Sequence, residues 1–175
     1  MTDIRLSLAI EAGVFAVPDT GTILVLRPHA GADLSALPKE RVRIVQGFRP
    51  DYDAFVAAGY AVTPEAEGQH GAAVVVLPRS RVEGRALIAA AVVSLPAGAP
   101  VIIDGARTDG VEGILREVRT RVTVGEVISK AHGKIFAFAA PEASVFADWE
   151  ARTTVLEDGS VTLPGIFSAD GPDPG

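Results

Sequence analysis

The chain has 175 residues, 48% hydrophobic and 22% charged, which is typical of one folded domain and excludes disorder along its whole length. Its 16 basic and 22 acidic residues give a net charge of −6, which excludes a protein that is basic overall but not a local basic patch. Because it has no cysteine, disulfides, thiolate metal sites and cysteine nucleophiles are excluded.

Strand and helix patterns alternate along the chain. In chain order we expect a helix at 4–12, strands at 22–26 and 42–46, a helix at 50–59, strands at 60–63 and 72–77, a helix at 80–95, a strand at 101–103, a helix at 109–121, strands at 122–128 and 134–139, and a short helix at 140–149. Ser80 and Asp109 are expected to cap the helices that follow them. Apolar strands separated by amphipathic helices predict an α/β fold, a doubly wound, mostly parallel, Rossmann-like sheet with helices on both faces. The last two strands predict a C-terminal antiparallel hairpin with His132 and Gly133 in its turn.

The end of the chain has a different character. Residues 152–163, centred on an Asp-Gly pair at 158–159, predict a hairpin or an extended linker, and residues 165–175 predict an exposed tail. The apolar stretch at 86–95 is too short for a bilayer, which needs about 20 residues, and the first residues do not form a signal peptide. We therefore expect a cytoplasmic protein with no membrane partner.

The known catalytic and nucleotide-binding motifs do not fit. After the first strand, residues 27–31 read Arg-Pro-His-Ala-Gly, with one glycine, and with a proline where a phosphate-binding loop needs an N–H donor. The three histidines are too far apart for a metal site. Asp104 and Asp109 follow a strand, where catalytic acids can lie, but strand-end and helix-capping roles are favoured for them. We predict no catalytic, cofactor-binding or metal residue in this chain, and no cofactor for it.

Basic side chains gather in the loops that follow the predicted parallel strands. These side chains are Arg79, Arg81, Arg107, Lys130, His132 and Lys134. Because loops after parallel strands meet at one edge of the sheet, we expect the six to converge there and to contact RNA phosphates. The alternative is that they are ordinary solvated loop charges. No aromatic residue is interleaved with them, which argues against base stacking.

Three segments carry a family resemblance: 101–110, 129–134 and 163–168, the last reading Leu-Pro-Gly-Ile-Phe-Ser and followed by Asp170-Gly171. They resemble the N-terminal domain of RsmC-type ribosomal RNA guanine-N2 methyltransferases, which have two tandem methyltransferase-like domains. The resemblance implies a class I methyltransferase fold. It also implies a methyltransferase-like domain at 1–140, then a connector and the start of a catalytic domain at 141–175. That C-terminal methyltransferase domain, and ribosomal RNA or the small ribosomal subunit, would be the partners.

In that family, the active domain binds S-adenosylmethionine through a glycine-rich loop after its first strand. It holds the target amino group with an Asn-Pro-Pro-aromatic turn after its fourth. Here residues 27–31 lack the repeated glycines. The turn after the fourth strand reads Leu77-Pro78-Arg79-Ser80, which keeps a proline but has neither the asparagine nor the aromatic residue. The resemblance therefore implies a degenerate, non-catalytic copy that supports the catalytic domain and helps to position RNA, with S-adenosylmethionine bound by the catalytic domain. Two alternatives stay open: a self-sufficient methyltransferase with an atypical site, and a purely structural interaction module.

Overall fold

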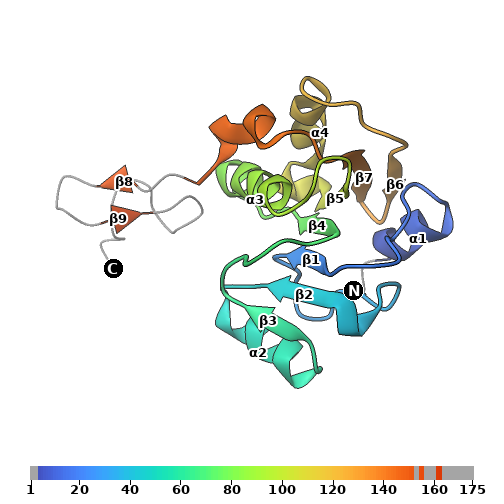
Figure 1. Cartoon of the computed structure of the whole chain (residues 1–175), viewed down its shortest axis with the longest axis vertical. Helices are drawn as coiled ribbons and strands as arrows, with labels where there is room; N and C mark the ends of the chain where they lie inside the picture. The colour runs from blue at the N-terminus through green and yellow to red at the C-terminus, as the bar shows by residue number, and fades with distance from the viewer. Residues whose placement is uncertain (1–3, 152–153, 156–160, 163–175) are drawn as a thin grey trace.

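A mixed seven-stranded sheet organises the protein, as the computed structural model in Figure 1 shows. The structure describes residues 4–151, 154–155 and 161–162. The strands are β1 (Ile23–Leu26), β2 (Val42–Val45), β3 (Ala61–Thr63), β4 (Ala72–Val76), β5 (Pro100–Ala106), β6 (Ile128–Lys130) and β7 (Gly133–Ala139). Their order is β3-β2-β1-β4-β5-β7-β6. β1 to β5 are parallel, whereas β7 is antiparallel to both β5 and β6. This is the predicted doubly wound sheet with its antiparallel hairpin.

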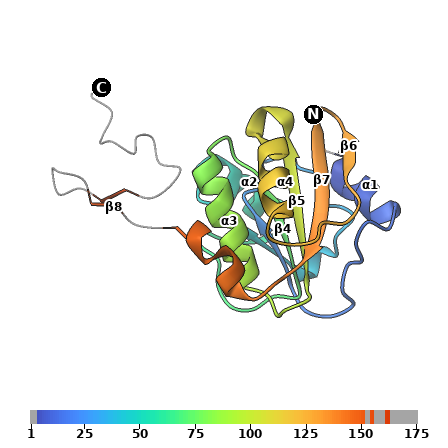
Figure 2. The same ribbon diagram turned by 90° about the horizontal axis from the view of Figure 1, so that it is seen from above.

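Helices cover both faces of this sheet. They are α1 (Arg5–Glu11), α2 (Arg49–Ala57), α3 (Arg81–Val93) and α4 (Val111–Arg119), with short 3₁₀ segments η1 (Lys39–Arg41), η2 (Arg107–Asp109) and η3 (Ala143–Trp149). Figure 2 shows α3 and α4 on one face and α1 on the other. Each face has its own apolar cluster, and the central strands supply side chains to both, which explains their unbroken apolar runs. None of the helices in the described ranges is long and apolar enough to span a membrane.

Some predicted boundaries are confirmed and others are wrong. Ser80 caps α3 by accepting a hydrogen bond from the Glu83 backbone N–H at 3.2 Å, as expected. Asp109 does not cap α4: it lies in η2, and Gly110 takes the capping position with φ of +76°, a conformation that favours glycine.

Two further predicted elements differ from the structure. Residues 122–127 are not a strand. Their valines pack against the α3–α4 side of the core, and one backbone bond, from Gly125 N–H to Ala137 O at 3.1 Å, ties them to β7. The helix expected at 140–149 is the 3₁₀ segment η3, because Pro141 disfavours helical backbone at Ala140 and Phe146 has non-helical angles.

Two short strands lie within the hairpin predicted at 152–163. β8 (Thr154–Val155) and β9 (Val161–Thr162) pair antiparallel in a separate sheet. The Asp-Gly turn, the 163–168 segment and the tail lie outside the described residues. The domain boundary after residue 140 stays a prediction, although Phe146 and Trp149 of η3 belong to the core on the α3–α4 face.

Candidate functional site: the carboxyl edge of the sheet

A crevice opens where the chain changes direction in the sheet. β1 and β4 are neighbours, but β2 lies beyond β1 on one side and β5 beyond β4 on the other. Ligands of open α/β sheets bind at such switch points, outside the carboxyl ends of the strands. Here a cleft of about 570 Å³ occupies that place, and Arg27, His29, Arg79, Glu83 and Thr108 are among the residues that line it.

Two of the residues that line this cleft, Arg27 and Glu83, form an ion pair. Arg27, directly after β1, has a left-handed backbone with φ of +62°, and its N–H donates to Val45 O at 2.8 Å. Its guanidinium lies 2.7 Å from the carboxylate of Glu83, in the first turn of α3. Burial raises the pKa of the Glu83 carboxyl, and Arg27 offsets only part of that effect. The cleft therefore holds a carboxylate whose ionised form is disfavoured.

The position that should bind a nucleotide ribose holds a different group. In dinucleotide-binding sheets an acidic residue about 20 positions after the first strand accepts hydrogen bonds from ribose hydroxyls. The residue 20 positions after Leu26 is Gln46, which is 2% exposed. Its Nε2 donates to Pro28 O at 2.8 Å, and its Oε1 accepts from the Phe48 N–H at 2.9 Å. Both ends of the amide are thus bound to backbone.

The turn after β4 is equally unsuited to the family's chemistry. Leu77 stands where the resembling family has asparagine, and it is 1% exposed. Its methyl groups lie against Gly84 and Gly105, so the side chain is part of the core at the floor of the cleft and offers the cleft no hydrogen-bonding group. Leu77 therefore does not fit a target amino group as the active domain of that family holds it, and Arg27 and Gln46 do not fit S-adenosylmethionine in the place where that domain binds it.

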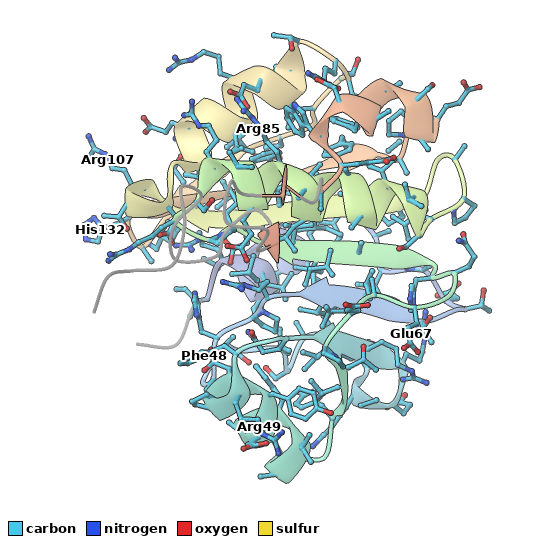
Figure 3. All side chains as sticks on the ribbon, turned by 90° about the vertical axis from the view of Figure 1, so that its left-hand side faces the viewer. Phe48, Arg49, Glu67, Arg85, Arg107 and His132 are labelled. Carbon is cyan, nitrogen blue, oxygen red and sulfur yellow. The ribbon has the colours of Figure 1, made fainter. Side chains whose placement is uncertain are left out.

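Four of the six predicted RNA-contact residues line one pocket. Arg107, Lys130, His132 and Lys134 surround a space of about 270 Å³ between η2 and the β6–β7 turn, with Glu112 also at its wall. The Arg107 N–H donates to His132 O at 2.8 Å, and Figure 3 shows the two side chains at the same end of the molecule. Among the described residues, Arg107, Lys130 and Lys134 have no ion-pair partner. We name this group the basic pocket.

A buried arginine supports the turn beneath that pocket. Ala131 and His132 both have left-handed backbones, with φ of 49° and 57°, which is costly for residues other than glycine. The Arg5 guanidinium donates to Lys130 O at 3.2 Å and to Ala131 O at 3.1 Å. Its Nε donates to Asp104 Oδ1 at 2.6 Å, and both side chains of that pair are buried. Asp104 is thus engaged in a structural ion pair.

The other two predicted residues lie apart from the basic pocket. Arg79 is exposed and lines the switch-point cleft. Arg81 lies 3.6 Å from Glu117, which also accepts two hydrogen bonds from Arg85, one from Nη2 at 2.5 Å and one from Nε at 3.0 Å. These contacts, the Arg85 hydrogen bond first, lower the pKa of Glu117 and link α3 to α4. RNA contact stays a prediction for all six residues.

An aromatic side chain that the sequence argument missed lies at this edge. Phe48 follows the end of β2 by three positions, and it is 58% exposed. Figure 3 shows it at the same end as Arg107 and His132, with Glu67 at the opposite end. No aromatic residue is interleaved with the six basic residues in the sequence, and Phe48 reaches this edge from a different loop. The available signal was its place just after a parallel strand, since such positions meet at one edge.

The comparison with solved structures bears on the fold. No protein-family model and no curated protein matches the chain. Among solved structures, it is similar to the Thermus thermophilus 16S rRNA N2 G1207 methyltransferase RsmC, with a TM-score of 0.66 and 19% identity over 98% of this chain and 49% of that one.

Other solved structures are similar as well, and two of them serve as examples. The N-methyltransferase NodS from Bradyrhizobium japonicum WM9 has a TM-score of 0.58 and 14% identity over 79% of this chain and 93% of its own. TrmN from Thermus thermophilus has a TM-score of 0.54 and 13% identity over 79% of this chain and 48% of its own. The chain thus spans about half the length of RsmC. At these identities the likeness concerns the fold alone, and the conclusion is that this chain has the class I methyltransferase fold, with a likeness at low identity to ribosomal RNA methyltransferases.

Proposed function

We propose that this chain is the non-catalytic N-terminal domain of a cytoplasmic ribosomal RNA guanine-N2 methyltransferase, in which it supports a catalytic domain and helps to position RNA. One observation carries the proposal: the sheet has the class I methyltransferase order, while the side chains at the positions that would bind cofactor and target make contacts within the chain instead. Gln46 is bound to backbone at both ends, Arg27 is paired with Glu83, and Leu77 is buried. In this proposal S-adenosylmethionine is bound by the catalytic domain.

Two further observations support it. The match to RsmC covers almost all of this chain and half of the other, as one domain of a two-domain enzyme would. The basic pocket brings Arg107, Lys130 and Lys134 together on a protein with a net charge of −6. Cations without carboxylate partners at one edge are suited to phosphate contacts.

The first test is the mass of the protein in its native cell, measured with an antibody against this chain on a denaturing gel. We expect a product near twice the 18.1 kDa of this chain. A product at 18.1 kDa would overturn the assignment to a two-domain enzyme.

The RNA role is tested in that native protein by a double substitution in the basic pocket. Arg107→Ala with Lys134→Ala should raise the KM for ribosomal RNA and leave kcat unchanged. The slope of log affinity against log salt should fall by about 0.7 for each lost contact to a single strand. The matched control is Arg116→Ala with Arg119→Ala, which removes the same charge from exposed positions in the last turn of α4. Equal effects of the two double variants would reject a specific role for the pocket.

A further inference from the structure

Phe48 is an exposed ring on a fixed backbone. Its N–H donates to the buried Gln46 amide at 2.9 Å, and its carbonyl accepts from the Tyr52 N–H at 2.9 Å. It is the most exposed large hydrophobic side chain in the described part of the chain. Covering such a ring with a flat apolar partner removes apolar surface from water, which lowers the free energy and favours binding.

The loop after β1 connects Phe48 to the switch-point cleft. Asp51, in the first turn of α2, accepts a hydrogen bond from the Ala30 N–H at 3.1 Å, so the start of α2 meets this loop. His29, the residue before Ala30, lines the cleft. Gln46 makes a second link through its bond to Pro28 O. The aromatic ring and the cleft therefore belong to one surface.

The same surface continues from the cleft to the basic pocket. Arg79 and Thr108 line the cleft together with His29, and Thr108 directly follows Arg107, which lines the basic pocket. This path crosses the carboxyl ends of β2, β1, β4 and β5, three strand spacings or about 14 Å. Figure 3 shows its two ends, Phe48 and Arg107 with His132, on the same side of the molecule.

The path carries more free positive than free negative charge. One of its acids, Glu83, is neutralised by its ion pair with Arg27. Three acids have no cationic partner among the described residues: Asp51, which accepts from the Ala30 N–H, Asp109 in the cleft and Glu112 in the basic pocket. Four cations make no ion pair with a described residue, namely Arg79, Arg107, Lys130 and Lys134. A polyanion is thus favoured along the path, and an apolar platform stands at its end.

We infer that this edge binds an unpaired stretch of RNA, with one base stacked on Phe48 and the phosphates on either side of the cleft held by Arg79 and the basic pocket. The inference deepens the proposed function and rests on it. Duplex RNA cannot satisfy the same surface, because its bases are already stacked and it presents phosphates and sugar hydroxyls to a protein. A stacking platform beside a row of cations is the arrangement that binds single strands with little sequence preference.

The test measures RNA binding by the 175-residue chain with fluorescence anisotropy at several salt concentrations. The probes are a labelled single strand of about ten nucleotides and a duplex of the same sequence. Phe48→Ala should weaken single-strand binding about 5- to 100-fold, leave duplex binding unchanged and keep the salt slope, because no phosphate contact is lost. Phe48→Trp should retain the affinity. The control is Val56→Ala, a half-exposed apolar side chain near the other end of α2.

Each other outcome overturns a distinct statement. If Phe48→Ala leaves single-strand binding intact while Arg107→Ala with Lys134→Ala weakens it, the stacking inference fails and the proposed function stands. The exposed Phe48 ring would then be assigned to a contact with another protein surface. The stacking inference also fails if Val56→Ala weakens single-strand binding as much as Phe48→Ala does. It fails likewise if Phe48→Ala weakens duplex binding as much as single-strand binding. If the unaltered chain binds neither RNA at about 50 mM salt, the RNA role fails with it. Unchanged thermal midpoints confirm that each variant is folded.

Discussion

Backbone strain is concentrated at the carboxyl edge of the sheet. In the described part of the chain, the residues other than glycine with positive φ are Arg27, Ala131 and His132. Arg27 lines the switch-point cleft and His132 the basic pocket. Each such backbone costs on the order of 1–3 kcal/mol and persists only where surrounding contacts enforce it. Strain of this kind is typical of functional edges, and here Arg5 and Gln46 supply the enforcing contacts.

The close packing of Arg5 against Gly133 predicts that adding one methyl group at Gly133 destabilises the fold. A Cβ at Gly133 would overlap the Arg5 guanidinium and the Gly105 carbonyl. Gly133→Ala should therefore lower the free energy of unfolding by about 1–3 kcal/mol, because the buried Arg5–Asp104 pair has to shift. Urea denaturation measures the loss. Gly125→Ala is the control, since its nearest neighbour, Ala137 O at 3.7 Å, is at ordinary contact distance. Equal stability of both variants would contradict the packing described.

The partly buried carboxyl of Glu83 predicts a pH-dependent stability. Its pKa is raised above the ordinary 4.5 by burial, with Arg27 lowering it by less, so the folded state favours the protonated form. Such a group stabilises most below pH 4.5, and that stability is lost as the pH rises through the folded pKa. Glu83→Gln does not titrate, so its stability relative to the natural chain should rise between about pH 4 and about pH 7 in urea denaturation. A relative stability that falls over this range would show that the Arg27 ion pair outweighs burial. Glu112→Gln, exposed on α4, is the control.

At the scale of elements, η3 joins the α3–α4 face through its aromatic residues. Trp149 is 7% exposed, lies 5.0 Å from the Phe146 ring and is covered by the Arg121 guanidinium, 4.6 Å from its centroid. Arg121 also binds both oxygens of Asp148, the second from Nη2 at 2.8 Å. Residues beyond 140 therefore contribute to the same core as α3.

This docking predicts that η3 unfolds together with the sheet. Trp149→Ala should lower the free energy of unfolding by about 3 kcal/mol, because it leaves a cavity under α3. Trp149 is the single tryptophan, so its fluorescence follows η3 alone while circular dichroism follows the helices. The two transitions should coincide in the natural chain. An earlier fluorescence transition would mean that η3 detaches independently. Phe48→Ala, at an exposed aromatic position, is the control for side-chain truncation.

What the sequence predicted depended on local signals. The central strands are apolar on both faces, and Ser80 caps the helix that begins with its neighbour, so both could be predicted from short windows. Arg5 could not, because its partner Asp104 lies 99 positions away. In residues 122–127 the valines alternate with other residues, as in a strand. They do so because they pack against the core, whose other side chains are distant in the sequence, and local pattern alone does not distinguish this from a strand. Arg81 was assigned to the basic edge because nothing local indicates its pairing with Glu117.

At the scale of the whole molecule, fold and cofactor site depend on different residues. The sheet order follows from two apolar clusters spread over most of the chain. A cofactor site depends on a few side chains in loops, so substitutions there leave the fold intact. A class I sheet can thus persist with Arg27, Gln46 and Leu77 engaged in intramolecular contacts.

This separation predicts that S-adenosylmethionine does not stabilise the chain. A domain with a Kd of about 10 μM gains about 2.7 kcal/mol at about 1 mM ligand, which raises Tm by about 5–10 °C for a chain of this size. For this chain we expect the Tm to change by less than about 1 °C in differential scanning fluorimetry, because Gln46 offers no carboxylate to the ribose and Arg27-Pro28 replaces the glycine-rich loop. An active class I methyltransferase in the same buffer is the positive control. A rise of several degrees that grows with the logarithm of ligand concentration would instead favour a self-sufficient enzyme with an atypical site.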